Sequence, residues 1–335
     1  MKVFDGHNDV LSRVLAAGPG AMEGFLSGDG EGHLDLPRAE LGGLAGACFA
    51  VFTAAPPPAD YEDGAYFVPV PHREALREGL AQAALLQRMA RASGGRLRIA
   101  RAAADLDGDG LAAVLHLEGA EPISTGLDEL EVLHAAGLRS LGLVWSRRNA
   151  FATGVPFAFP GTPDQGPGLT DAGRALVRAC GELRIALDVS HLNERGFWEV
   201  AELSDAPLIA SHSGAHVLCP SPRNLTDDQL RAVGERRGLV GINFFPGFLR
   251  ADGADEAETP LVLIAEHAAH AAQLAGPECV GLGSDFDGAT MPAPLGDVTG
   301  LPALLDTLRG AGFTDVQLEG IAFANWRRVL AETWG

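Results

Sequence analysis

Two hydrophobic patterns alternate along this chain. Short runs of consecutive apolar residues predict buried β-strands, and between them apolar residues recur every three or four positions, which predicts amphipathic helices. The predicted strands are Lys2–Asp5, Gly46–Thr53, Ala112–Leu117, Leu138–Val144, Ile185–Ser190, Pro207–Ser211, Leu239–Phe244 and Cys279–Ser284. The predicted helices are Arg73–Ala92, Leu127–Ala136, Thr170–Leu183, Asn193–Leu203, Thr226–Arg236, Pro260–Leu274, Pro302–Arg309 and Thr314–Thr333.

This order of strands and helices predicts an α/β fold. Regular alternation favours a parallel sheet, and eight strand–helix units favour closure into a (β/α)8, or TIM, barrel. No linker divides residues 1–335, so we expect a single domain that ends in a C-terminal helix. Pro56-Pro57-Pro58 begins a long excursion after the second strand, and the Gly/Pro-rich stretch Ala152–Gly168 follows the fourth. Both are predicted to be capping loops over the mouth of the barrel.

The composition excludes several classes of function. With 44 acidic and 25 basic residues, the net charge of −19 argues against nucleic acid or an anionic membrane as a partner. Lys2 is the only lysine and lies at the wrong end of the first strand, so mechanisms based on a Schiff-base or carbamylated lysine are improbable. The four cysteines (Cys48, Cys180, Cys219 and Cys279) form no CxxC pair, which predicts buried free thiols.

The apolar stretches also predict where the protein works. No uninterrupted apolar run approaches the ~20 residues that a membrane span needs. Asp5, His7 and Asp9 interrupt the apolar stretch near the start, which argues against a signal peptide. We therefore expect a cytoplasmic protein without a membrane partner.

Polar side chains gather where the predicted strands end. His7 and Asp9 stand two apart, so in extended chain they share a face and can bind one metal ion. The ends of later strands bring Glu118, His191, His212 and Asp285. Because the carboxyl ends of parallel strands meet at one rim, these side chains are expected to converge. Imidazoles and carboxylates are ligands of divalent metals, so the sequence predicts a metal site there.

Each of these residues also has an ordinary explanation. A single histidine or acid after a strand commonly caps a helix or braces a loop, and Asp287 fits such a role. Strand-end histidines or acids on five of eight strands are difficult to attribute to caps alone. His116 is expected inside the barrel below the metals, and Glu121 is expected to support a loop. Helical stretches or their approaches carry His216, His267 and His270, which are expected to be solvated or packed.

The same segments resemble the membrane (renal) dipeptidase family, zinc peptidases built on amidohydrolase-like barrels. The matching segments are Asp5-Gly6-His7-Asn8-Asp9, Leu117-Glu118-Gly119, Asp188-Val189-Ser190-His191, Ser211-His212-Ser213, Pro222-Arg223-Asn224 and Gly283-Ser284-Asp285-Phe286-Asp287-Gly288. Each motif alone is common, but the set occurs in the right order over nearly the whole chain.

The resemblance implies a binuclear zinc site. In it His7 and Asp9 bind one ion, His191 and His212 bind the other, and Glu118 bridges them. Two dications held ~3.5–4 Å apart would acidify a shared water into the nucleophile. Such donors also accept manganese or cobalt, so other divalent metals are possible.

Further roles follow from the same resemblance. Asp285 matches the acid that takes the proton of the nucleophile and passes it to the leaving amine. Arg223 matches the residue that holds the substrate carboxylate, for which a planar guanidinium suits bidentate pairing. The resemblance also makes a homodimer plausible.

One position departs from the family pattern. In Leu143-Val144-Trp145-Ser146-Arg147-Arg148-Asn149, Trp145 stands where the family places a histidine that contacts substrate and stabilises the developing oxyanion. Indole has one donor and no acceptor, so it cannot replace imidazole in every role. Either the metals and a nearby donor (Arg147 or Arg148) suffice for peptide hydrolysis, or the site acts on another amide.

Three functions stay open at this point. The first is a zinc-dependent dipeptidase that cleaves small dipeptides, including those with D residues. The second is a related metal hydrolase of lactams or N-acyl amino acids, which shares every metal ligand and differs around Trp145, Arg223 and the Tyr61–Pro71 loop. The third is a non-catalytic barrel that only binds metal, against which the acid at Asp285 argues.

Overall fold

Eight parallel strands form a closed barrel, as the alternation predicts. The computed structural model of the protein describes residues 1–54 and 68–335. The circle closes because β4 pairs with β2 as well as with β5. The strands are β1 (Val3–Asn8), β2 (Leu44–Phe52), β4 (Leu111–Glu118), β5 (Leu138–Gly142), β6 (Ala186–Asp188), β7 (Ile209–Ser213), β8 (Leu239–Ile242) and β9 (Val280–Leu282).

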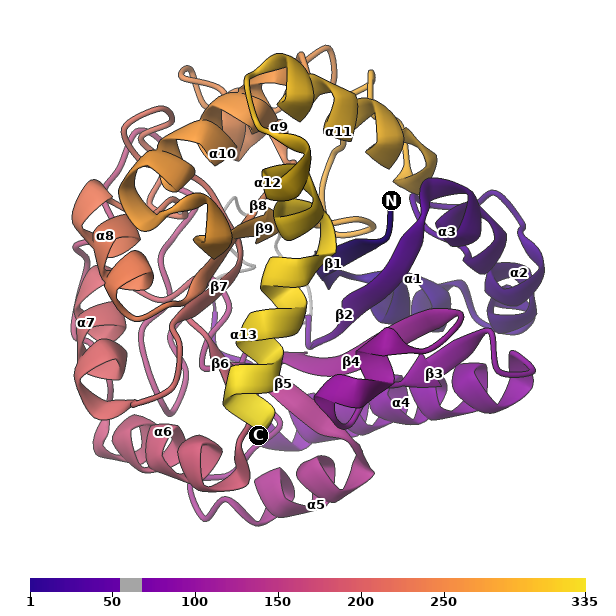
Figure 1. Ribbon diagram of the computed structural model, residues 1–335. Coiled ribbons are helices and arrows are strands. Elements are labelled where there is room, and N and C mark those ends of the chain that lie inside the picture. The colour runs from indigo at the N-terminus through magenta and orange to yellow at the C-terminus, as the bar shows by residue number, and fades with distance from the viewer. Residues whose placement is uncertain (55–67) are drawn as a thin grey trace.

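Helices surround the barrel, and the last of them crosses one of its ends (Figure 1). They are α1 (Val10–Ala17), α2 (Ala21–Ser27), α3 (Leu36–Gly42), α4 (His72–Ala92), α5 (Asp128–Ala136), α6 (Asp171–Leu183), α7 (Glu194–Leu203), α8 (Asp227–Glu235), α9 (Pro246–Leu249), α10 (Val262–Ala275), α11 (Leu301–Gly310), α12 (Asp315–Glu319) and α13 (Asn325–Trp334). The hydroxyls of Thr170 and Thr226 accept backbone N–H groups at the starts of α6 and α8, so both act as N-caps.

The hydrophobic pattern of the sequence did not predict some of the helices and strands. Helices α1 to α3 have only seven or eight residues each, too few to show a clear helical period. A ninth strand, β3 (Leu97–Ile99), pairs with the start of β4 outside the circle. The predicted helix Thr314–Thr333 is interrupted by a π-helical turn at Gly320–Ala324.

The predicted capping loops have different outcomes. Pro56-Pro57-Pro58 lies outside the described residues, as does most of the Tyr61–Pro71 stretch. The loop after β5 reaches the mouth of the barrel, because Phe157 from Ala152–Gly168 lines the cavity there. Among the described residues, no helix is both long and apolar enough to cross a membrane.

Strand β4 shows how the sequence places polar groups at one end of the barrel. Its odd-numbered residues, such as Leu115 and Leu117, pack in the main hydrophobic core. Ala112 and Val114 alternate with them and pack in a separate cluster with Trp326. His116 and Glu118 continue the same period of two toward the carboxyl end. The barrel interior therefore changes from apolar to ionisable along a single strand.

Strands β1 and β7 each carry an irregularity where they approach that end. Between Asp5 and Asn8, and between Ala210 and Ser213, the bulged strand has one more residue than its partner. Such bulges redirect side chains and are common beside active sites. His7 lies inside the first bulge and His212 inside the second.

Glycines make room for the bulge in β7. A Cβ added at Gly6, Gly241 or Gly283 would overlap the backbone carbonyl oxygen of Ser211. Any larger residue at these positions would push the β7 backbone aside. These glycines therefore help to place the neighbouring His212.

The opposite end of the barrel is closed by α13. The Trp326 side chain is buried, lies with its ring centre 5.2 Å from that of Phe4, and donates its indole N–H to the carbonyl of Leu282 at 3.0 Å. Figure 1 shows α13 crossing this opening. The C-terminal helix thus provides a floor for the barrel, on the side away from the polar rim.

We predict that Trp326→Ala destabilises the fold without altering the polar rim. Loss of a buried tryptophan should lower the free energy of unfolding by about 3–5 kcal/mol, measured by urea denaturation. Trp198→Ala is the matched control, because Trp198 is 39% exposed on α7 and should cost far less. Equal effects of the two substitutions would contradict this account of α13.

Candidate metal centre and active site

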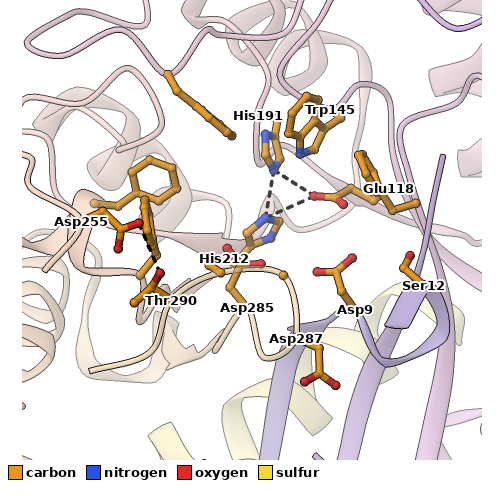
Figure 2. Close-up of a pocket in the computed structure, with 16 residues that line it drawn as sticks. Asp9, Ser12, Glu118, Trp145, His191, His212, Asp255, Asp285, Asp287 and Thr290 are labelled. Carbon is orange, nitrogen blue, oxygen red and sulfur yellow. Dashed lines mark hydrogen bonds and ion pairs between the residues drawn. The ribbon is translucent and has the colours of Figure 1, made fainter. Parts of the chain in front are cut away.

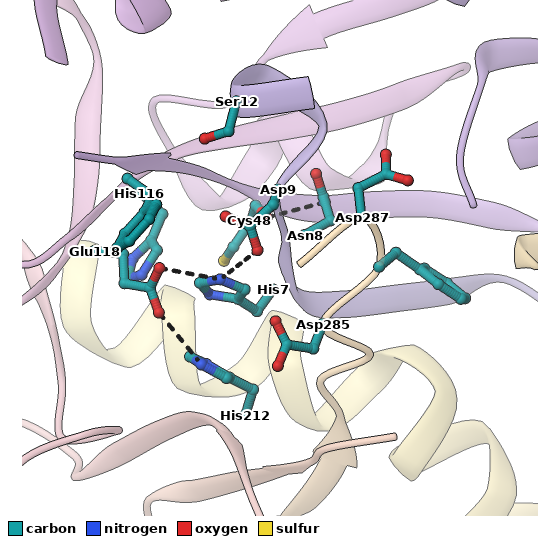
Figure 3. Close-up of polar contacts among 12 residues, drawn as sticks. His7, Asn8, Asp9, Ser12, Cys48, His116, Glu118, His212, Asp285 and Asp287 are labelled. Atoms are coloured by element: carbon teal, nitrogen blue, oxygen red, sulfur yellow. Dashed lines mark hydrogen bonds and ion pairs between the residues drawn. The ribbon is translucent and has the colours of Figure 1, made fainter. Parts of the chain in front are cut away.

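Six predicted residues meet at the carboxyl ends of the strands. His7 belongs to β1, Glu118 ends β4 and His212 belongs to β7. Asp9 precedes α1, while His191 and Asp285 stand on turns after β6 and β9. Figure 3 shows His7 between the carboxylates of Asp9 and Glu118, with His212 and Asp285 beside them.

Two of these side chains depend on unusual backbone geometry. His191 has φ 64° and Asp285 has φ 66°, the left-handed region that residues with a Cβ seldom adopt. Each such residue costs on the order of 1–3 kcal/mol and persists only where its surroundings enforce it. Backbone strain of this kind is common at functional sites.

Glu118 is the centre of the group. Its Oε1 lies 2.9 Å from Nε2 of His191 and 3.4 Å from Nε2 of His212, while Oε2 lies 3.7 Å from Nε2 of His7. Nε2 of His7 is also 3.4 Å from Oδ2 of Asp9. All five side chains are buried. One carboxylate therefore reaches donors on both sides.

These donors fall into groups suited to a cation. Ligand atoms lie within 4.8 Å of one another in three sets: His7, Asp9 and Glu118; Glu118, His191 and His212; and His7, His212 and Asp285. Both ring nitrogens of His7 are buried without a hydrogen-bond partner among the described residues. A buried imidazole lone pair that faces two carboxylates has the chemistry of a metal ligand. The residues present therefore fit a divalent metal.

The charges of the group favour protons where no metal is bound. Burial lowers the pKa of His7, but the carboxylates of Glu118 and Asp9 outweigh it and raise that pKa to about 10. Burial raises the pKa of Glu118 to about 8. A metal ion must displace these protons, so its binding is coupled to pH.

His191 and His212 behave differently. Burial, together with the positive charges of Arg223 and His7, lowers the pKa of each far below 6.5, so both imidazoles are neutral at neutral pH. Their Nε2 atoms are 3.0 Å apart. Each Nδ1 lies 2.7 Å from a serine hydroxyl, that of Ser146 for His191 and that of Ser211 for His212.

Asp285 is held by a residue that the sequence reasoning missed. Asn243, just beyond β8, donates its side-chain N–H to Oδ2 of Asp285 at 3.0 Å. Burial raises the pKa of Asp285 above its ordinary value of 3.8. Two residues further on, Asp287 accepts Nε–H of Arg13 at 2.8 Å and the backbone N–H of His33 at 2.6 Å, so it braces the loop that carries Asp285.

Arg223 is a buried cation beside the centre. Its Nη2–H donates to the carbonyl of His212 at 3.0 Å, whereas Nε and Nη1 have no partner among the described residues. Its guanidinium carbon lies 5.2 Å from the ring centre of Phe248, a contact of the cation–π type. Burial lowers the pKa of Arg223 to about 10, so it remains charged at neutral pH.

A cavity of about 510 Å³ opens over the group. Phe52, Trp145, Phe157, Phe245 and Phe248 form its apolar wall, and Figure 2 shows Asp255 and Thr290 across the space from Trp145. The ring centre of Trp145 is 5.3 Å from that of Phe157 and 5.8 Å from that of His191. Trp145 is therefore part of the wall next to a ligand candidate. No simple sequence signal marked the four phenylalanines.

Other polar residues lie outside the centre. Nε of Arg147 is 2.7 Å from Oε1 of Glu121, and its Nη2–H donates to the carbonyl of Thr53, so both charges are used in a buried ion pair. Arg148 is exposed and does not line the cavity. His116 lies beside the His7 ring and contacts Ser140, inside the barrel. The three histidines expected to be solvated or packed contact loops or a helix start: His216 at Gly161, His267 at Ala215 and Leu249, and His270 at Asp227.

The class of the protein follows from where these donors lie. Imidazoles and carboxylates that converge at the carboxyl rim of a closed parallel barrel are typical of metal-dependent barrel hydrolases. Residues 1–334 match the sequence profile of the membrane dipeptidase family, peptidase family M19, and the chain belongs to that family of metallopeptidases. A protein of the pqqA 5' region of Klebsiella pneumoniae is 46% identical over 257 residues, which are 76% of this chain and 95% of that protein.

Two solved structures are similar over the whole chain. A metallopeptidase from Rhodobacter sphaeroides, liganded with a phosphinate mimic of the dipeptide L-Ala-D-Ala, has a TM-score of 0.95 at 45% identity, over 100% of this chain and 99% of its own. The dipeptidase AC has a TM-score of 0.95 at 47% identity with the same coverage. The fold and the family expected from the sequence are therefore confirmed.

The buried charges predict how the metal-free protein responds to pH. Glu118 ordinarily releases its proton near pH 4.5 and His7 near 6.5, but in the folded chain they hold it to about pH 8 and about pH 10. A group whose pKa is raised by folding stabilises the fold at low pH and loses that contribution as the pH rises through its folded pKa. We expect the free energy of unfolding, measured in chelator, to fall between about pH 7.5 and about pH 9, above the range in which unfolded histidines titrate.

His191 and His212 act in the opposite direction near pH 6.5, where the unfolded imidazole is half protonated and the folded one, whose pKa is lowered, is neutral; above about pH 7.5 they are neutral in both states and no longer oppose the trend. Glu118→Gln removes one of the two groups and should make the dependence shallower. Stability that rises over this interval in the metal-free protein would contradict the assignment of protons.

Proposed function

We propose that this dipeptidase uses two zinc ions to hydrolyse dipeptides that carry a free amine and a free carboxylate, including dipeptides with a D residue at the carboxyl end. One observation carries the proposal: two groups of potential ligands share a single buried carboxylate, that of Glu118. The phosphinate dipeptide mimic bound by the Rhodobacter sphaeroides relative supports the choice of substrate.

In this proposal each of the five predicted ligands binds a metal ion. His7 and Asp9 would hold one ion, His191 and His212 would hold the other, and Glu118 would contact both. When bound, zinc supplies a Lewis acid that lowers the pKa of a water molecule and polarises a carbonyl oxygen. Other divalent metals suit the same mixture of imidazole and carboxylate.

Asp285 is the proton carrier in the proposed reaction. Asn243 donates to Oδ2, so in this proposal Oδ1 exchanges the proton with the reacting groups. Burial raises the pKa of Asp285, which makes the carboxylate a stronger base than an exposed aspartate. It can therefore take a proton from the attacking water and return it to the leaving amine.

Arg223 is the proposed partner of the substrate carboxylate. It keeps a positive charge, and its Nε and Nη1 have no hydrogen-bond partner among the described residues, so a substrate carboxylate could accept from one of them in a buried place. Phe248 lies beside the guanidinium and itself lines the cavity, so Arg223 lies next to one of the lining residues. Charged hydrogen bonds in such a dry place are strong and directional.

Trp145 would then contact substrate as an apolar surface. The rings of Trp145, Phe157 and His191 have their centres 5.3–6.4 Å from one another, so Trp145 packs beside both and adds apolar surface next to the centre. Arg147 is engaged by Glu121 and so offers no replacement for the missing histidine. Catalysis in this proposal relies on the metals for stabilising the developing oxyanion. The single domain over residues 1–335, the homodimer and the cytoplasmic location stay predictions.

Substrate comparison tests the proposal directly. We expect kcat/KM for L-Ala-D-Ala to exceed that for N-acetyl-D-Ala and for L-alanyl-D-alaninamide by about 10- to 100-fold. This factor corresponds to the free energy of one charged hydrogen bond. The first analogue lacks the free amine of the proposed substrate, and the second lacks the carboxylate proposed to pair with Arg223.

The other functions predict different outcomes. Faster turnover of N-acyl amino acids or lactams than of dipeptides would identify the related amide hydrolase. Zinc binding without turnover of any dipeptide would favour the non-catalytic scaffold. A chelator should abolish dipeptide turnover, and restored zinc should recover it.

A further inference from the structure

The two imidazoles of the second ligand group are anchored differently. Nδ1 of His191 lies 2.7 Å from Oγ of Ser146, and Nδ1 of His212 lies 2.7 Å from Oγ of Ser211. A neutral imidazole has one N–H and one lone pair, so the hydrogen bond at Nδ1 decides what Nε2 can do. The direction of each serine hydroxyl therefore matters for metal binding.

The Ser211 hydroxyl has a fixed direction. It donates to Oδ2 of Asp188 at 2.5 Å, and the backbone N–H of Ser211 donates to Oδ1 of the same carboxylate at 2.8 Å. The backbone N–H of Ser190 donates to Oδ1 as well, at 2.9 Å. Since a carboxylate only accepts, the hydroxyl hydrogen of Ser211 points to Asp188. Its oxygen can then only accept from His212.

We infer that Asp188 and Ser211 are positioning residues that hold His212 in the tautomer with hydrogen on Nδ1. Nε2 of His212 then presents its lone pair to the cavity, ready for a metal ion. Both residues are buried, so water does not compete for these bonds. A carboxylate that orients a ligand histidine is a known device of metal sites, and here a serine hydroxyl connects the two.

The hydrogen bond with Ser146 does not fix the tautomer of His191. Among the described residues, the Ser146 hydroxyl has one hydrogen-bond partner, Nδ1 of His191. Toward that atom the hydroxyl can donate or accept. Nε2 of His191 lies 3.0 Å from Nε2 of His212, and because that atom of His212 presents a lone pair in the inferred tautomer, Nε2 of His191 carries the hydrogen when no metal is bound. Metal binding at His191 would need the lone pair of Nε2, so the single ring hydrogen would shift from Nε2 to Nδ1 and the Ser146 hydroxyl would accept it there.

Asp188→Asn should reverse the arrangement around Ser211. The two backbone N–H groups require an acceptor at Oδ1, so the amide nitrogen takes the place of Oδ2 and donates to the Ser211 hydroxyl. Ser211 then donates to Nδ1 of His212, which puts the hydrogen on Nε2. This tautomer blocks the metal, so Asp188→Asn should be worse than removal of the hydroxyl in Ser211→Ala.

Nitrogen NMR of the metal-free protein, labelled with ¹⁵N-histidine, tests the inference without reference to activity. The two ring nitrogens of a neutral imidazole give well-separated signals, and His212→Gln identifies those of His212. Wild type should show hydrogen on Nδ1 of His212, and Asp188→Asn should show it on Nε2. A wild-type His212 with hydrogen on Nε2 would overturn the inference, whatever the variants do.

Zinc affinity, measured by competition with a chelator, gives the second readout. Ser211→Ala should weaken zinc binding by about 10- to 100-fold, and Ser211→Thr, which keeps the hydroxyl, should restore it. Ser140→Ala is the matched control, because Ser140 is a buried serine that contacts His116 and no proposed ligand. Equal affinities of Ser211→Ala and Ser140→Ala would also overturn the inference.

This inference rests on the proposed role of His212 as a ligand, but the two fail separately. If wild-type protein binds no zinc, the proposed function fails while the tautomer result still stands. If zinc binds and His212 has the wrong tautomer, only the positioning role fails.

Discussion

The buried carboxylate of Glu118 is the feature on which the rest of the site depends. Three imidazoles approach it from β1, the turn after β6, and β7. Burial of an unpaired carboxylate is costly, so the group must share a proton or bind a cation. The raised pKa values of Glu118 and His7 show the first solution, and two metal ions would provide the second. The arrangement of the side chains therefore suits a bound cation, whose positive charge would neutralise the buried carboxylate.

The barrel makes this arrangement possible by separating its two ends. Apolar residues of several strands and Trp326 fill one end, and the ionisable residues occupy the other. Bulges in β1 and β7 turn His7 and His212 toward Glu118, and glycines around the Ser211 carbonyl leave space for one of them. Positive φ at His191 and Asp285 completes the set. Packing elsewhere in the barrel offsets the local strain at the rim.

The sequence predicted the barrel and the convergence of its ligand candidates because both depend on simple periods. Strand-end residues such as Glu118 can be recognised where an apolar run stops at an acid. Helices α1 to α3 were missed because each is only two turns long. The bulges were invisible for another reason: an extra residue in one strand is defined only by its partner strand.

Residues that orient other residues were the hardest to foresee. Asn243, Ser146 and Ser211 are ordinary polar residues in sequence, and their importance comes from atoms contributed by distant strands. Arg147 illustrates the opposite case, since its position beside Trp145 suggested a site donor, whereas the ion pair with Glu121 engages it elsewhere. Hydrogen-bond direction is a property of the folded molecule and cannot be read from spacing.

The central claim is that Glu118 joins two metal ions. Metal content per chain, measured by mass spectrometry on Glu118→Gln after dialysis against zinc, tests it most directly. Asp255→Asn is the matched control, because Asp255 lines the same cavity but belongs to none of the ligand groups. We predict about two zinc ions in wild type and in Asp255→Asn, and fewer than two in Glu118→Gln with most activity lost. Two retained ions and full activity in Glu118→Gln would contradict the account.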